Sequence, residues 1–129
     1  MKHAVLALGV ACLAGIPALA HHSYGGFYLD RTVTLEGRLE RLHYGNPHTL
    51  LIIRTGDGVV HTAEWRPASQ LSQMGVASTT LQAGDRVAVA GSPPRDPSIR
   101  RLVTLKEVRR TADGWMWRID GGRVTAGAP

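Results

Sequence analysis

Histidines carry most of the chemistry that this sequence offers, and two of them stand where the chain can be cut. His21 and His22 directly follow an apolar leader that ends in Ala18-Leu19-Ala20. Cleavage after Ala20 would leave the α-amine and the imidazole of His21 on one residue, where both can bind the same metal ion. Copper(II) accepts such a nitrogen pair together with one further imidazole in a roughly T-shaped set. We therefore predict a copper or related transition-metal site at a terminal histidine.

The third nitrogen ligand is expected from a turn further along the chain. In Gly45-Asn46-Pro47-His48 the proline keeps the residue before it out of helical geometry, so His48 stands in a rigid turn and is the first choice. His43, across the same turn, is the substitute. His22 can also coordinate a metal ion, but its backbone geometry competes with that of His21. The alternative is that His48 only binds a backbone carbonyl within the turn.

Two carboxylates, Glu64 and Asp30, are candidates for orienting a ligand imidazole. The remaining histidine after the leader, His61, is predicted to face the middle of the strand that His48 begins. At about 3.3 Å per residue, the two imidazoles would stand well over 10 Å apart. They cannot share one ion, so we predict that His61 is a packed or surface residue.

Two further hypotheses need no metal. Small barrels bind ligands on their second and third strands and the adjoining loops, where this chain carries Tyr44, Trp65 and Arg66, a platform for a sugar or another small molecule. Alternatively, another periplasmic protein binds an arginine-rich segment. Six basic residues fall within sixteen positions of that segment: Arg95, Arg100, Arg101, Lys106, Arg109 and Arg110.

The sequence contains none of the common catalytic motifs. It has no Gly-x-Ser-x-Gly elbow, no His-Glu-x-x-His pair, no phosphate-cradling glycine loop and no cysteine nucleophile after the leader. A binding function is therefore favoured over an enzymatic one.

Residues 1–20 have the pattern of a signal peptide, with Lys2 ahead of an apolar run and a small-residue cleavage site. The run is shorter than the about 20 apolar residues that a membrane-spanning helix needs. A lipoprotein signal ending at Cys12 is the alternative. Removal of 20 of the 129 residues leaves 109, without cysteine, and loss of Lys2 lowers the net charge from +5 to +4. We predict a single periplasmic domain with no transmembrane segment after cleavage and no nucleic acid partner.

Strands are expected to position these groups, because apolar and polar residues alternate along much of the chain. We predict an N-terminal arm at 21–31, a barrel domain at 32–120 and a disordered tail at 121–129. Gly37 marks a bulge or sharp bend, and Trp115, Trp117 and Ile119 share one strand face. The strands are expected at 31–44, 48–55, 59–66, 87–91, 101–110 and 115–119, with one short helix at 68–74.

A helix between the third and fourth of five strands is the order of an oligonucleotide/oligosaccharide-binding (OB) barrel. The predicted fold is therefore all-β with one short helix, a small OB-like antiparallel barrel of five to six strands.

Three motifs, in this order, resemble a family of small exported proteobacterial proteins of unknown function. They are Ala20-His21-His22-Ser23, Gly45-Asn46-Pro47-His48, and Leu81-Gln82-Ala83-Gly84-Asp85-Arg86-Val87 followed by Gly91-Ser92-Pro93-Pro94-Arg95. The resemblance extends over nearly the whole chain after the leader. It implies an exported, single-domain, barrel-like protein and carries no established activity.

Overall fold

The computed structural model describes residues 24–120 and 123–128. The predictions for the leader, His21 and His22 concern residues outside this range. Within the described residues, seven strands, one short α-helix and one turn of 3-10 helix follow one another along the chain. No helix in these residues is long and apolar enough to cross a membrane.

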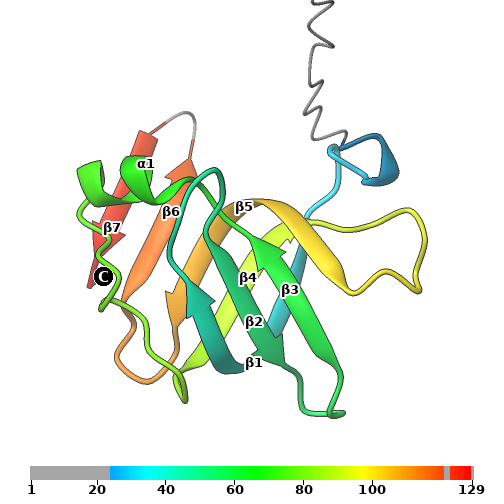
Figure 1. Cartoon of the computed structure of the whole chain (residues 1–129), viewed down its shortest axis with the longest axis horizontal. Helices are drawn as coiled ribbons and strands as arrows, with labels where there is room; N and C mark the ends of the chain where they lie inside the picture. The colour runs from blue at the N-terminus through cyan, green and yellow to red at the C-terminus, as the bar shows by residue number, and fades with distance from the viewer. Residues whose placement is uncertain (1–23, 121–122, 129) are drawn as a thin grey trace, which may run out of the picture.

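Five strands close into a barrel (Figure 1). An antiparallel meander of β1 (Val33–His43), β2 (Leu50–Arg54) and β3 (Val60–Glu64) is joined along β1 to an antiparallel pair of β4 (Arg86–Ser92) and β5 (Arg101–Arg110). The barrel closes where β3 pairs with β5, at Thr62 with Arg101 and at Ala63 with Leu102. The predicted all-β barrel with one short helix is confirmed. The closing pair, however, is parallel rather than antiparallel.

Gly37 lies near the point where β1 changes partner. Residues up to Arg38 pair with β4, and residues from Arg38 onward pair with β2. A Cβ atom on Gly37 would lie only 2.4 Å from the carbonyl oxygen of Arg54, so β2 can approach this closely only because residue 37 is glycine. The register itself shifts slightly later, between Leu39 and Arg41.

β5 is interrupted by a bulge. Its pairing with β4 shifts so that Gly91 alone stands opposite three residues, 104–106. Thr104 has a φ angle of 52°, a left-handed conformation that costs energy in a β-branched residue. Gly91 is required here too, because a Cβ atom would lie 2.8 Å from the carbonyl oxygen of Val103. The bulge brings residues 104–106 to the wall of the cleft described below.

The hydrophobic core fills the barrel and continues under an outer extension of the sheet. Trp117 of β6 (Met116–Asp120) is fully buried and meets Trp65 edge to face, with 5.1 Å between ring centroids. Trp115 and Ile119 pack against the same core, in agreement with the predicted strand face. β7 (Arg123–Gly127) pairs with β6 along its whole length. The prediction of a disordered tail is therefore wrong for residues 123–127, which cover an edge that β6 would otherwise expose.

The helix α1 (Ala68–Gln73) occupies the predicted place between β3 and β4 and lies at one end of the barrel (Figure 1). Leu71 is its main buried side chain. The single proton of the Tyr44 hydroxyl is shared between two carbonyl oxygens, that of Val76 at 2.7 Å and that of Ala68 at 3.1 Å. Tyr44 thus ties both ends of the helical segment to the strand region before it.

The arm before β1 is anchored to the loop between β4 and β5. Phe27 forms a β-bridge with Pro94, directly after the 3-10 turn η1 (Tyr24–Gly26). The guanidinium group of Arg95 lies 4.5 Å from the centre of the Tyr28 ring and donates to the carbonyl oxygen of Gly25. The chain is therefore held against the barrel from Tyr24 onward.

Candidate functional site

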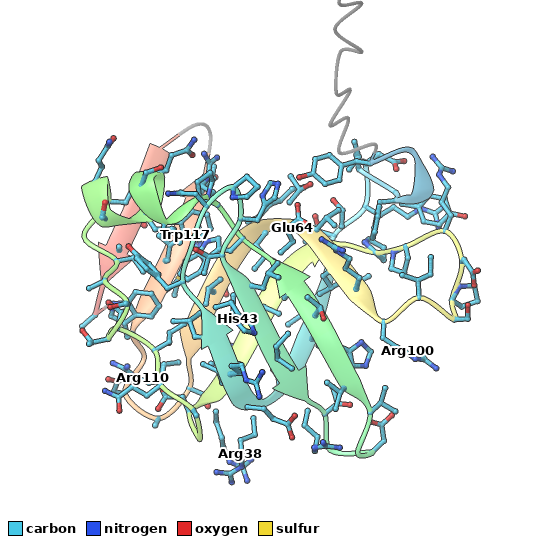
Figure 2. The ribbon with its side chains drawn as sticks, in the orientation of Figure 1. Arg38, His43, Glu64, Arg100, Arg110 and Trp117 are labelled. Carbon is cyan, nitrogen blue, oxygen red and sulfur yellow. The ribbon has the colours of Figure 1, made fainter. Side chains whose placement is uncertain are left out.

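A cleft of about 520 Å³ opens where the arm, the end of β3, α1 and the β5 bulge meet. Its polar wall contains Tyr24, His48 and Glu64, and its apolar wall contains Trp65 and Ile119. Figure 2 shows Glu64 at the same end of the barrel as α1 and the arm. The volume lies in the range of small-molecule sites, about 300–1,000 Å³.

Glu64 is the central group of the polar wall and is only 3 % exposed. Its Oε1 atom accepts a hydrogen bond of 2.7 Å from the Tyr24 hydroxyl, and its Oε2 atom is paired with the Arg101 guanidinium group. The Nδ1 atom of His48 lies 3.4 Å from Oε1. Three elements that are far apart in sequence therefore converge on one buried carboxylate.

This environment keeps Glu64 ionised. Burial by itself would raise its pKa, but the hydrogen bonds from Tyr24 and Arg101 and the positive charge of Arg101 together hold the pKa below its usual value. The opposite effect falls on Tyr24, where burial and the hydrogen bond to Glu64 raise the pKa to about 12. Tyr24 is thus a hydrogen-bond donor at neutral pH, and Glu64 is an acceptor.

The His48 imidazole faces this carboxylate with its Nδ1 atom. When Nδ1 carries the proton and faces a carboxylate, Nε2 holds the lone pair that can bind a metal ion, an arrangement common around metal-ligating histidines. Of the two carboxylates considered from the sequence, Glu64 contacts His48, whereas Asp30 is exposed in the arm.

Neither His43, the predicted substitute ligand, nor His61 lines this cleft. His43 is exposed on β1 and is not among the residues that line the cleft. His61 pairs with Ile53, five residues beyond His48, which corresponds to about 16 Å along the strand. Among residues 24–120 and 123–128, no group of three or more histidine, cysteine or acidic side chains could hold a metal ion. His21 and His22 lie outside the described residues.

The predicted ligand platform is brought together only in part. Trp65 and Arg66 line the cleft, but Trp65 is 3 % exposed and belongs mainly to the core. Tyr44 does not line the cleft, and its hydroxyl is occupied by the two carbonyls of the helical segment. In the arginine-rich segment, Arg101 pairs with Glu64 and Arg110 pairs with Asp113. The guanidinium groups of both arginines are therefore engaged in ion pairs within the domain.

Sequence reasoning did not assign Tyr24 or Arg101 to the site, nor the bulge at Thr104. Arg101 was recognised only as one of several basic residues, because its role depends on the closure of β3 against β5. The sole local signal was Glu64 itself, an acidic residue between Ala63 and Trp65, both of which are buried. A carboxylate in that position requires charged or hydrogen-bonding partners.

Comparison with known proteins adds family membership but no activity. A model described as a family of unknown function (DUF6152) matches residues 9–104. No curated protein sequence is significantly similar to the chain.

Proposed function

The chain belongs to this family of unknown function, and we propose that it is an exported small β-barrel protein that binds copper(II) or a related transition-metal ion. The ion is held by the amine and imidazole of a mature N-terminal His21 and by the imidazole of His48. Glu64 orients His48 from behind. The product of leader cleavage is the functional, periplasmic form.

One observation carries the proposal: Tyr24 and His48 meet at the same oxygen of Glu64. The Tyr24 hydroxyl is 2.7 Å and the His48 Nδ1 atom 3.4 Å from Oε1. His21 precedes Tyr24 by three residues, and three Cα steps of 3.8 Å span at most about 11 Å. Because Tyr24 lines the cleft that contains His48, this short span supports a terminal His21 as the partner of His48.

The residues of the cleft support a metal site through the carboxylate that faces His48. Tyr24 and Arg101 hold the Glu64 carboxylate by hydrogen bonds, and the His48 Nδ1 atom lies 3.4 Å from it, an arrangement typical of a carboxylate behind a metal-ligating imidazole. Three nitrogen ligands without thiolate suit copper(II) among the divalent ions that bind imidazole.

The test is a copper(II) titration of residues 21–129, with His21 confirmed as the N-terminus by mass spectrometry. We expect binding of one ion per chain. Acetylation of the His21 α-amine should weaken binding by at least 100-fold, because it removes one of the two nitrogens that the terminal residue contributes. His48→Ala should weaken it by at least 10-fold.

His61→Ala and His43→Ala are the matched controls, since both remove one histidine and both should leave the affinity unchanged within about twofold. An affinity that acetylation of the α-amine does not alter would refute the terminal-histidine site. A loss on His43→Ala that exceeds the loss on His48→Ala would make His43 the third ligand and refute the role given to His48.

A second candidate function rests on the apolar wall of the cleft. Its volume of about 520 Å³, with Arg66 and Gln70 beside Trp65, suits a small organic molecule bound without metal. A screen of sugars and aromatic compounds by thermal shift, in the presence of a chelator, tests this. Ligands that stabilise the wild type but not Arg66→Ser would favour it over the metal site.

A further inference from the structure

Three arginines form a row across neighbouring strands at the other end of the barrel. Arg38 on β1 is the direct cross-strand partner of Arg54 on β2 and also of Arg86 on β4. Directly opposed residues share a face, with Cβ atoms about 4.5–5.5 Å apart. Figure 2 shows Arg38 at the end of the barrel far from Glu64. This row is therefore separate from the cleft described above.

The charges of the row are only partly neutralised. Arg54 pairs with Glu40 at 2.5 Å and donates to the carbonyl oxygen of Gly58. Arg38 donates to the carbonyl oxygen of Gly84 at 3.1 Å, which leaves its charge unpaired. Within the described part of the chain, neither Arg38 nor Arg86 has a carboxylate within 4.0 Å.

Fold stability does not explain this arrangement. Like charges placed directly opposite each other on a sheet are destabilising, and the row contains two such pairs in succession. All three side chains are exposed, so the row does not fill a space in the core.

The row borders a small hollow. A depression of about 230 Å³ is lined by the three arginines together with Gly37, Thr55 and Gly56. A second depression of about 240 Å³ shares Gly37, Gly56 and Arg86 with the first and contains Glu36, the only acidic residue of the two linings. The hollow is smaller than sites for drug-sized ligands and suits a compact anionic group.

We propose that this row is a binding site for a phosphate group, presented either by a soluble phosphate compound or by the headgroup of an anionic lipid. Guanidinium groups offer paired donors that match the oxygens of phosphate, and neighbouring forks can contact one phosphate together. A bound anion also removes the repulsion between the arginines. The repulsion therefore lowers the stability of the free protein, and binding of the anion restores it.

The first experiment measures binding of inorganic pyrophosphate to residues 21–129 by calorimetry, with ionic strength held constant by sodium chloride. Arg38→Gln and Arg86→Gln should each weaken binding at least 10-fold. The matched control is Arg41→Gln, which removes the same charge from the same strand, is exposed and lines neither hollow. Its affinity should stay within twofold of the wild type.

Thermal unfolding tests whether Arg38→Gln loses pyrophosphate binding only because it misfolds. Arg38→Gln should melt at the same temperature as the wild type or higher in the absence of ligand, because repulsion is removed, and should lose the pyrophosphate-induced rise. A lower melting temperature of Arg38→Gln both with and without pyrophosphate would refute the conclusion that the arginine row destabilises the free protein.

The second experiment distinguishes the source of the phosphate. Vesicles of phosphatidylcholine with or without phosphatidylglycerol are sedimented with the wild type and the same three variants. Retention that needs phosphatidylglycerol and is lost in Arg38→Gln but not in Arg41→Gln assigns the site to a lipid headgroup. Pyrophosphate binding without such retention assigns it to a soluble phosphate compound. Binding to neither probe, or equal losses in Arg38→Gln and Arg41→Gln, overturns the proposal.

Discussion

Replacing Glu64 by glutamine is the most direct test of its role as the charged centre of the cleft. Glutamine preserves the size of the side chain and can still accept a hydrogen bond from Tyr24, but it presents an amide where Arg101 needs a carboxylate. A hydrogen bond to a charged group contributes about 1.5–3 kcal/mol. Because the Arg101 side chain is 42 % exposed, water compensates part of that loss. We therefore expect Glu64→Gln to lower the free energy of unfolding by about 2 kcal/mol at pH 7.

Glu40→Gln is the matched control, because Glu40 is also paired with an arginine, Arg54, yet both side chains are largely exposed, at 36 % and 49 %. Exposed pairs of this kind contribute about 0–1 kcal/mol. Urea unfolding of residues 21–129, analysed with a common slope, measures both losses. A loss in Glu64→Gln no greater than that in Glu40→Gln would refute the conclusion that Glu64 is the charged centre of the cleft.

The pH dependence supplies a second check with a definite sign. The pKa of Glu64 is lower in the folded protein than its ordinary value of 4.5, so the carboxylate stabilises the fold when ionised. This contribution is fully present above pH 4.5 and is lost as the pH falls through the lowered folded value. The difference between wild type and Glu64→Gln should therefore be constant near neutral pH and shrink in acid.

Three further predictions concern the frame around the site. Gly37→Ala should destabilise the protein by about 2 kcal/mol or more, because its Cβ would lie 2.4 Å from a backbone oxygen of β2; Gly45→Ala, whose Cβ meets nothing within 4 Å, should change the unfolding midpoint little. The Arg110 guanidinium holds the pKa of Asp113 at about 2. NMR titration should show that pKa rising toward 3.8 in Arg110→Gln, and an unchanged value would contradict the contact. Tyr44→Phe should cost about 1 kcal/mol in urea unfolding and increase amide exchange in α1, since the hydroxyl binds two carbonyls of that segment; unaltered exchange would mean that packing alone holds the helix.

Local patterns were sufficient to predict six of the seven described strands and the helix. Alternation is a property of each segment by itself, so β5 was predicted at its observed bounds and α1 within one residue. Gly37 was recognised as a point of bending, although its reason, the carbonyl oxygen of Arg54, belongs to another strand. β7 was missed because its five residues include glycine and alanine, and its order depends on pairing with β6.

The site was less accessible to sequence reasoning because its contacts join distant segments. His48 was selected from its rigid turn, and Glu64 was named as one of two carboxylates that could orient an imidazole. The meeting of Tyr24, His48 and Arg101 at Glu64 depends on barrel closure and on the docking of the arm, neither of which has a local signature. The arginine row has no local signature either, because Arg38, Arg54 and Arg86 become neighbours only through strand register.

The seam between β3 and β5 has a consequence for how the barrel opens. It consists of two residue pairs, Thr62 with Arg101 and Ala63 with Leu102, that are joined through a long stretch of chain. Because these are the fewest residue pairs between any two adjoining strands in the described part of the chain, we expect the seam to be the first join to part in native fluctuations. Glu64 follows directly after Ala63 and pairs with Arg101, so this ion pair helps to hold β3 against β5. A ligand that strengthens the pair between Glu64 and Arg101 will therefore slow amide exchange along the whole seam, including at residues that the ligand does not contact.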